Sequence, residues 1–340
     1  MNITFLVGNG FDILHGMKTS YTHFYKYIEK NFDDEKIDNN FFYRQIKGNI
    51  SNWSDFEFEM GQCTFQTEFN VDEYMNSLEE FRNDFEDYLI EEGSKVEQPR
   101  IDETLFSFIQ DMKEGDRETI ERLYENVASP DTIVNFVNFN YTELLDKAVF
   151  DVEWNRVANE LNTMIKRTVI GRANFGKLYH IHEKINDGAF LGVNDEGQLD
   201  AIKFTEESLE VLIKPNLIDA YNSYRIEEVE KIILESDLII IFGMSLGDTD
   251  KIWWQKIIQS LYHKSNQRLV IHSYNPGITA SIKNPSQYLR ADRDIKQLIL
   301  KHDSGQLAPW IQKKIMTVLN SQTMFCHKIN NEYEYTTSIT

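Results

Sequence analysis

Cysteine and long apolar runs are both scarce in this sequence, and each absence excludes a class of protein. Only Cys63 and Cys326 occur among 340 residues, which is too few for a disulfide framework or a four-cysteine zinc site. No apolar stretch approaches the roughly 18 residues that a membrane-spanning helix needs. The first residues also lack the basic segment and cleavage site of a secretory signal. We therefore expect a cytoplasmic protein without a membrane segment.

Positive charge is the second scarcity. The chain carries 35 lysines and arginines against 55 aspartates and glutamates, which gives a net charge of −20. A surface of this sign repels phosphate backbones, and no cluster of basic residues offsets it. We therefore expect no nucleic-acid partner, and a nuclease is disfavoured. The sequence shows no metal–carboxylate cluster either, so we expect no metal.

Short apolar runs alternate with helical patterns along most of the chain. The runs predict buried strands at residues 3–7, 132–137, 168–170, 177–181, 238–242 and 268–272. Between them, helical spacing predicts helices at residues 19–31, 141–166, 226–235, 249–262 and 286–301. The run at 238–242 is apolar throughout, which is typical of a strand covered on both faces. This alternation predicts an α/β fold with a doubly wound, mostly parallel, Rossmann-like sheet.

One region departs from this alternation. Residues 33–130 are rich in acidic and aromatic side chains at helical spacing and show almost no strand signal. We interpret them as a helical insertion that caps the strand ends, where ligands bind in open α/β sheets. Residues 1–340 would then form a single nucleotide-binding domain. Residues 320–340 are expected to form a terminal hairpin or tail.

The first predicted strand leads directly into Gly8, Asn9 and Gly10. A glycine after a buried strand permits a tight turn, and a second glycine lets the main chain approach a ligand closely. The helix expected next would offer N–H groups and a positive dipole end to an anion. The fingerprint Gly-x-Gly-x-x-Gly is incomplete, because Ile13 occupies its third glycine position.

Polar residues follow two other predicted strands. Asn140 lies after residues 132–137, where its amide would either cap the next helix or grip a ribose hydroxyl. His180 and His182 share one face of a strand because they are two residues apart. His182 ends that strand, so it would act either as a general base near neutral pH or as a structural histidine.

The segment after the most apolar strand contains Gly243, Ser245, Gly247 and Asp248. The glycines permit close backbone approach, Ser245 could donate to a phosphate, and Asp248 could cap the next helix. The segment also matches the nucleophile elbow of hydrolases. We disfavour a serine hydrolase, because no later histidine and acid stand in a recognisable context.

Charged residues elsewhere have two open interpretations. Asp55 and Glu57 belong to an acidic string after Trp53; such strings are usually solvated, but under a capping insertion they could reach a ribose or an attacking water. Lys214 precedes a proline, which favours extended backbone. It could pair with a phosphate or simply be exposed.

In their chain order, these segments resemble the AbiH family of bacterial phage-abortive-infection proteins. The resemblance covers about residues 1–274, and it is carried by residues 6–12, 16–21, 53–57, 138–142, 180–182 and 242–248.

The same order is similar to sirtuin-type NAD-binding domains. In this resemblance residues 8–10 stand at the glycine-rich loop, residues 140–142 at the asparagine element, and His182 at the catalytic histidine. Residues 243–246 match a further loop, and Asn275 matches an asparagine on the adenosine side.

Two substitutions and one absence separate the chain from sirtuins. Glu183 replaces the glycine after the catalytic histidine, Thr142 replaces an aspartate, and the zinc-binding cysteine pairs are missing. The absence argues against a protein deacylase and leaves the NAD-hydrolase branch of defence proteins.

The resemblance thus implies an anti-phage defence protein that binds NAD+ as its substrate and hydrolyses the nicotinamide–ribose bond. Asn140 would orient the ribose or the water, His182 would act as general base, and Asp55 and Glu57 would stabilise the developing cation. The residues expected to bind the nucleotide are Gly8, Asn9, Gly10, Asp12, Tyr141, Gly243, Ser245, Asp248 and Asn275.

The alternative is a sensor that binds a nucleotide without turnover and signals to a partner defence protein. Glu183 and Thr142 favour this alternative. A homo-oligomer is also open.

Overall fold

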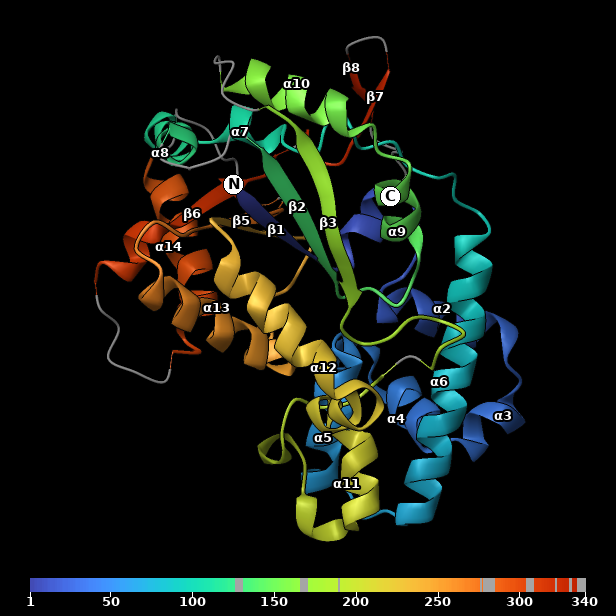
Figure 1. Ribbon diagram of the computed structural model, residues 1–340. Helices are drawn as coiled ribbons and strands as arrows, with labels where there is room; N and C mark the ends of the chain where they lie inside the picture. Colours follow the sequence, from blue (N-terminus) through green and yellow to red (C-terminus); the bar gives the residue numbers. More distant parts are fainter. Residues whose placement is uncertain are drawn as a thin grey trace.

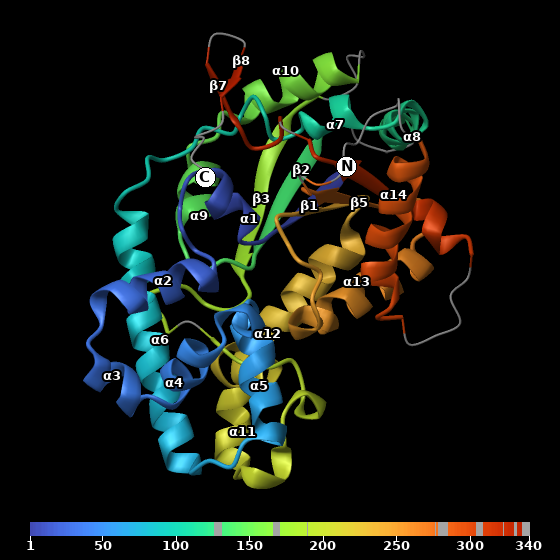
Figure 2. The same ribbon diagram turned by 180° about the vertical axis from the view of Figure 1, so that it is seen from behind.

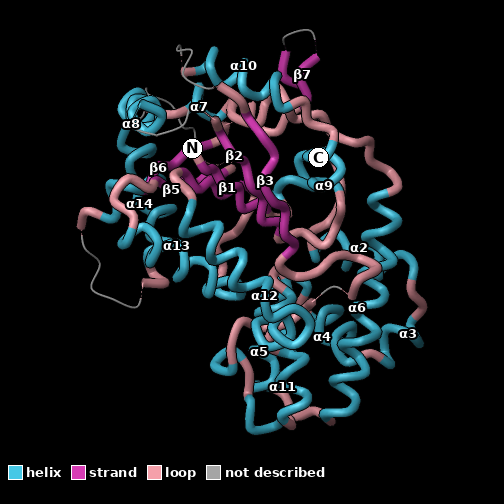
Figure 3. The backbone as a smooth tube through the Cα atoms, viewed as in Figure 1, coloured by secondary structure: helices cyan, strands magenta, loops and turns pink. Residues whose placement is uncertain are grey.

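The centre of the protein is a sheet of six parallel strands in the order β3-β2-β1-β4-β5-β6. The computed structural model describes residues 1–125, 131–165, 171–188, 190–275, 277, 285–303, 309–321, 323–329 and 332–334. Figures 1 and 3 show the strands as one twisted layer among helices. The strands are β1 (Asn2–Val7), β2 (Thr132–Asn138), β3 (Ala173–His180), β4 (Leu238–Phe242), β5 (Arg268–Ser273) and β6 (Ile315–Leu319). This order is that of the Rossmann fold, so the predicted doubly wound α/β class is confirmed.

Helices cover both faces of the sheet, as the alternation of side chains along β1 requires. Ile3, Phe5 and Val7 belong to the core on one face and Leu6 to the core on the other, because successive strand side chains point to opposite faces. The first face packs against α7 (Phe108–Asp111), α8 (Glu114–Glu125), α9 (Leu144–Phe150) and α10 (Trp154–Met164). The second packs against α12 (Lys214–Glu235), α13 (Lys251–His263) and α14 (Pro285–Leu300).

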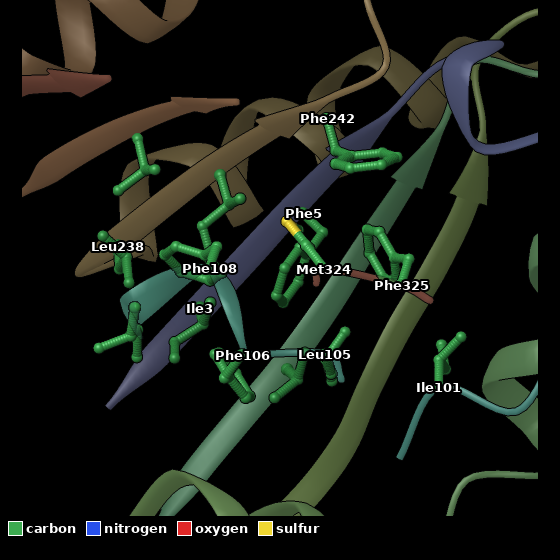
Figure 4. Packing of buried hydrophobic residues seen from close by; sticks show 14 of the residues in the cluster. Ile3, Phe5, Ile101, Leu105, Phe106, Phe108, Leu238, Phe242, Met324 and Phe325 are labelled. Atoms are coloured by element: carbon green, nitrogen blue, oxygen red, sulfur yellow. The ribbon is translucent and has the colours of Figure 1, made fainter. Parts of the chain in front are cut away.

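Aromatic side chains fill the first of these cores. The ring of Phe5 lies 5.5 Å from that of Phe106 and 5.8 Å from that of Phe325, between centroids, and Figure 4 shows all three side chains over the sheet. Tilted ring pairs at this spacing add to the stabilisation from burial alone.

A third core lies beyond the carboxyl ends of the strands. It joins α2 (Tyr21–Asn31), α3 (Asp34–Asn39), α4 (Phe41–Gly48), α5 (Phe56–Gln66), α6 (Val71–Gly93) and α11 (Glu206–Leu212). In Figures 1 and 2 these elements lie together at one end of the molecule, and we call them the helical body. Residues 33–130 contribute both to this body and, through residues 101–124, to the first core over the sheet.

Several predicted elements have different bounds in the structure. The helix expected over residues 141–166 is two helices, α9 and α10, separated at Asp151 and the extended Glu153. Helix α12 begins at Lys214, well before residue 226, because Pro215 occupies its first turn, a position that proline favours. The strand expected at residues 168–170 lies outside the described residues.

Strand β6 was not predicted from the sequence. Its short apolar run is also compatible with a helix, because Ile311, Ile315 and Leu319 recur at helical spacing. Pairing with β5 decides the outcome. Near the C-terminus, β7 (His327–Ile329) and β8 (Glu332–Glu334) pair antiparallel. Within the part of the chain that is described, we find no helix with the length and apolar character needed to cross a membrane.

Candidate functional site

Strands β1 and β4 are neighbours in the sheet, and the loops that follow their carboxyl ends are in main-chain contact. The N–H of Gly8 donates to the carbonyl of Phe242, and the N–H of Gly10 donates to the carbonyl of Gly243, both at 2.9 Å. A Cβ on Gly10 would lie 2.5 Å from the Cα of Gly243. Gly243 has φ +68°, a conformation that glycine adopts without strain. These glycines mark the topological switch point of the sheet, where α/β proteins bind ligands.

The helix after β1 is short. Helix α1 (Gly10–Leu14) has five residues, so its dipole is small. The side chain of Asn9 does not cap it and instead accepts a hydrogen bond from the Thr19 hydroxyl.

A cavity of about 1090 Å³ opens at this switch point and extends under the helical body. Of the residues predicted to form the site, those that line it are Gly8, Asn9, Gly10, Asp12, Asp55, Glu57, Asn140, Tyr141, His182, Gly243 and Ser245. Two predicted residues, Asp248 and Asn275, are not in the lining. The Asp248 carboxylate lies 2.9 Å from the Lys301 ammonium, and the N–H of Asn275 donates to the Asn320 side chain.

Asn140 is held on three of its four polar groups. Its N–H donates to the side chain of Asn138 at 3.0 Å, and its carbonyl accepts from Nδ1 of His180 at 3.1 Å. Its Nδ2 donates to Oδ1 of Asp12 at 3.3 Å. Its Oδ1 has no hydrogen-bond partner among the described residues, although Asn140 is buried.

Asp12 is buried in contact with Asn140. Its Oδ2 accepts a hydrogen bond from the Thr142 hydroxyl at 2.7 Å. Burial raises the pKa of Asp12 to about 7, against the opposing effect of the Thr142 hydrogen bond, because a low-dielectric setting disfavours the charged carboxylate. Asp12 can therefore change charge near neutral pH.

A chain of buried charges links the helical body to His182. Oε1 of Glu57 accepts a hydrogen bond from the Tyr141 hydroxyl at 2.5 Å, and Oε2 lies 2.6 Å from Nζ of Lys214. Nζ of Lys214 is also 3.3 Å from Oδ1 of Asp250, which is 3.1 Å from Nε2 of His182. We call Tyr141, Glu57, Lys214, Asp250 and His182 the buried relay.

Neighbouring charges keep Asp250 and Lys214 ionised despite their burial. Burial by itself would raise the pKa of Asp250, but the adjacent Lys214 and His182 hold that pKa well below its usual range. Burial opposes the charge on Lys214, yet Asp250 and Glu57 raise its pKa above the usual value. Asp55, beside this group, has a pKa of about 6 through burial and the charge of Glu57.

The other end of the cavity is mostly apolar. Ile271, His272 and Tyr274 come from the end of β5, and Leu298 comes from α14. Burial lowers the pKa of His272 to about 4, so its imidazole is neutral at pH 7. Among the described residues that line the cavity, none is a lysine or arginine.

A family model described as Bacteriophage abortive infection AbiH matches residues 4–272. The chain belongs to the AbiH family. The match begins in β1 and ends in β5, so it includes every lining residue named above except Tyr274 and Leu298. A comparison with curated proteins found no match.

AbiH membership indicates a role in bacteriophage abortive infection. The segments quoted for the resemblance meet at the cavity of this AbiH chain, since residues 8–12, 54–57, 139–142 and 243–246 all contribute to its lining. Glu183 has φ +55°, so the backbone after His182 has the left-handed conformation that glycine favours, although glutamate occupies the position.

Two members of the relay were not assigned a role from the sequence. Lys214 is buried and pairs with two carboxylates, whereas the sequence left it either exposed or on a phosphate. Asp250 was given no role from the sequence and only lies in the first turn of the helix expected over residues 249–262. Pro215 signals the beginning of α12, but no sequence signal shows that Glu57, 157 residues away from Lys214, lies beside it.

Proposed function

We propose that this AbiH protein hydrolyses NAD+ at the nicotinamide–ribose bond. The observation that carries the proposal is the meeting of Asn140 and His182 at one cavity at the switch point of a Rossmann-like sheet. These two side chains come from segments that follow different strands, β2 and β3. Polar side chains that converge on this crevice from different loops are typical of nucleotide sites in α/β proteins.

The reaction needs a site that tolerates positive charge. When the bond from C1′ to the pyridinium nitrogen breaks, its electron pair stays on nitrogen and nicotinamide leaves as a neutral molecule. The ribose becomes an oxocarbenium-like cation, which water attacks to give ADP-ribose and a proton. Three carboxylates, Asp55, Glu57 and Asp250, line the cavity near His182, and fixed anions stabilise a developing cation.

His182 is the proposed acceptor of the proton from water. Its Nε2 faces the Asp250 carboxylate at 3.1 Å, which favours the tautomer with hydrogen on Nε2. Nδ1 is then the nitrogen that takes the proton. A carboxylate that orients an imidazole in this way also stabilises the imidazolium that forms. Asn140 would hold the ribose or the attacking water through its unpartnered Oδ1.

The backbone at the switch point would accommodate the diphosphate. Gly8, Gly10 and Gly243 carry no side chains that could obstruct it, and Ser245 lines the same wall. The apolar end, with Tyr274 and Leu298, would receive the adenine. Because the N–H groups of Gly8 and Gly10 already donate to the carbonyls of Phe242 and Gly243, the Ser245 hydroxyl is the proposed donor to the phosphates.

The test is incubation of purified protein with NAD+ and separation of the products. Nicotinamide and ADP-ribose should appear with wild type, and both Asn140→Ala and His182→Ala should reduce turnover about 100-fold or more. His263→Ala, at the end of α13 and outside the cavity lining, is the matched control. The proposal is wrong if folded wild-type protein leaves NAD+ intact both alone and with extract from phage-infected cells.

A nucleotide sensor is the second candidate, favoured by the side chain of Glu183. Glu183 directly follows His182, at a position where a catalytic loop of the sirtuin type has glycine. Its carboxylate forms an ion pair with Arg225 on α12. Calorimetry separates the candidates, because a sensor binds NAD+ or ADP-ribose tightly and forms no product.

A further inference from the structure

We propose that Asp12 is a positioning residue that orients the side-chain amide of Asn140, leaving Oδ1 as the acceptor for a hydroxyl or water donor at the reacting ribose. The inference rests on the proposed function and deepens it. Asp12 would act through Asn140 and not on the nucleotide itself.

When Asp12 is ionised, the contacts of Asn140 allow one orientation of its amide. The main-chain N–H and carbonyl are fixed by Asn138 and His180, so the side chain starts from a rigid point. An ionised Asp12 has only acceptor oxygens, and its Oδ1 therefore takes Nδ2 of Asn140. The reversed amide would set two oxygens against each other.

The amide oxygen that remains needs a donor. Oδ1 of Asn140 has no partner among the described residues, and Asn140 is 4% exposed. A buried acceptor without a hydrogen bond is costly, so a ligand that brings an O–H group to this cavity wall recovers that cost. An apolar residue would fill the same space without the cost, which favours a role for the acceptor in binding or catalysis.

Asp12 itself is placed to act indirectly. It is 1% exposed, and its two oxygens are engaged by Asn140 and Thr142. The charged groups that face it from neighbouring elements are His180 on β3 and Asp146 on α9, which lie 2.9 Å apart between Nε2 and Oδ1. They form the outer support of the same frame, since His180 also holds the carbonyl of Asn140.

A swap of the two side chains tests the pairing. In Asp12→Asn the new amide can satisfy either orientation of Asn140, and in Asn140→Asp two carboxylates oppose each other. In the double variant, the new amide at position 12 donates to the new carboxylate at position 140 while still accepting from Thr142, which restores an oxygen acceptor on the cavity side. We expect each single variant to lower kcat for NAD+ about 100-fold with KM changed less than about threefold.

The double variant should recover at least about tenfold over the product of the two single losses, as coupled neighbours do. Asp292→Asn is the matched control, since Asp292 is half-buried, pairs with lysines and lies outside the cavity lining. It should change thermal stability without changing kcat. ADP-ribose affinity is measured by calorimetry on all variants.

The outcomes separate the inference from the proposed function. If wild type turns over NAD+ and Asp12→Asn keeps its kcat, or the swap recovers nothing while the double variant is folded, the positioning role is wrong and hydrolysis stands. If wild type neither cleaves NAD+ nor binds ADP-ribose, both fall. If wild type binds ADP-ribose without cleavage, hydrolysis falls, and recovery of affinity in the swap still supports the pairing, whereas no recovery overturns it.

Discussion

Gly10 and Gly243 are in backbone contact, with the N–H of Gly10 donating to the carbonyl of Gly243 at 2.9 Å. A Cβ on Gly10 would approach the Cα of Gly243 to 2.5 Å, and main-chain atoms there cannot move aside without shifting β1 or β4. We predict that Gly10→Ala destabilises the fold by about 1–3 kcal/mol, as overpacking does, and abolishes ligand binding. Urea unfolding and calorimetry with ADP-ribose measure the two effects.

Gly115 provides the control for this substitution. It lies in the first turn of α8, and a Cβ there would meet nothing within 4 Å. Gly115→Ala should be neutral or stabilise by up to about 1 kcal/mol, because alanine favours helix and loses less entropy on folding. Equal destabilisation by the two variants would contradict the close-approach argument.

Lys214 connects two acids that the fold buries. Glu57 and Asp250 are 8% and 19% exposed in their side chains, so removing the ammonium would leave them uncompensated. We predict that Lys214→Met destabilises the protein by about 3–5 kcal/mol, the usual cost of breaking a buried pair. Chemical denaturation measures it.

The matched double variant identifies the cause. Adding Glu57→Gln to Lys214→Met removes one of the stranded charges, so we expect part of the stability to return. Lys47→Met, which breaks an exposed pair with Asp34, should leave the stability almost unchanged. No recovery in the double variant would mean that packing, and not charge, explains the loss.

Asp250 should affect the rate more than binding. Its carboxylate faces Nε2 of His182, and its pKa is held low, so it remains ionised throughout the usual assay range. On the proposed reaction, Asp250→Asn removes the charge that supports the imidazolium, and we predict a fall in kcat of about 10²–10⁴-fold with little change in KM. Steady-state kinetics with NAD+ tests this, and an unchanged kcat would remove His182 from the role of base.

Asp12 should make stability depend on pH. Its folded pKa of about 7 lies above the usual value of 3.8, so the folded state binds this proton more tightly than the unfolded state. Stability from this group is therefore greatest below about pH 4 and is lost as pH rises through 7, by about 4 kcal/mol for a shift of this size. Asp12→Asn should gain on wild type across that window in urea unfolding. A constant difference from about pH 4 to pH 8 would contradict the raised pKa.

The sequence predicted the layers of the fold because their signals are local. The wholly apolar run of β4 and the glycines around Asn9 each identify an element from neighbours in the chain. The strand ends then predicted which loops share a crevice, and Asn140 and His182 do line one cavity. Asp248 could not be placed in this way, because its ion pair with Lys301 depends on the packing of α14.

The ion pairs of the buried relay and the raised pKa of Asp12 could not be predicted from local sequence signals. The relay joins Glu57 in α5, Lys214 in α12 and Asp250 before α13, and only the packing of the helical body against the strand ends brings them together. The pKa of Asp12 has the same origin, since burial and not sequence context sets it. Strand β6 was not predicted for a related reason, because its strand conformation depends on pairing with the edge of β5.

The position of β1 affects when the cavity can form during synthesis. β1 is translated before both of its partners, since it pairs with β2 on one side and with β4 on the other. A ribosome-bound chain therefore has no glycine contact and no closed cavity until residues 238–243 have emerged. On the proposed reaction, incomplete translation products could not cleave NAD+, because the pocket exists only once these residues have left the ribosome.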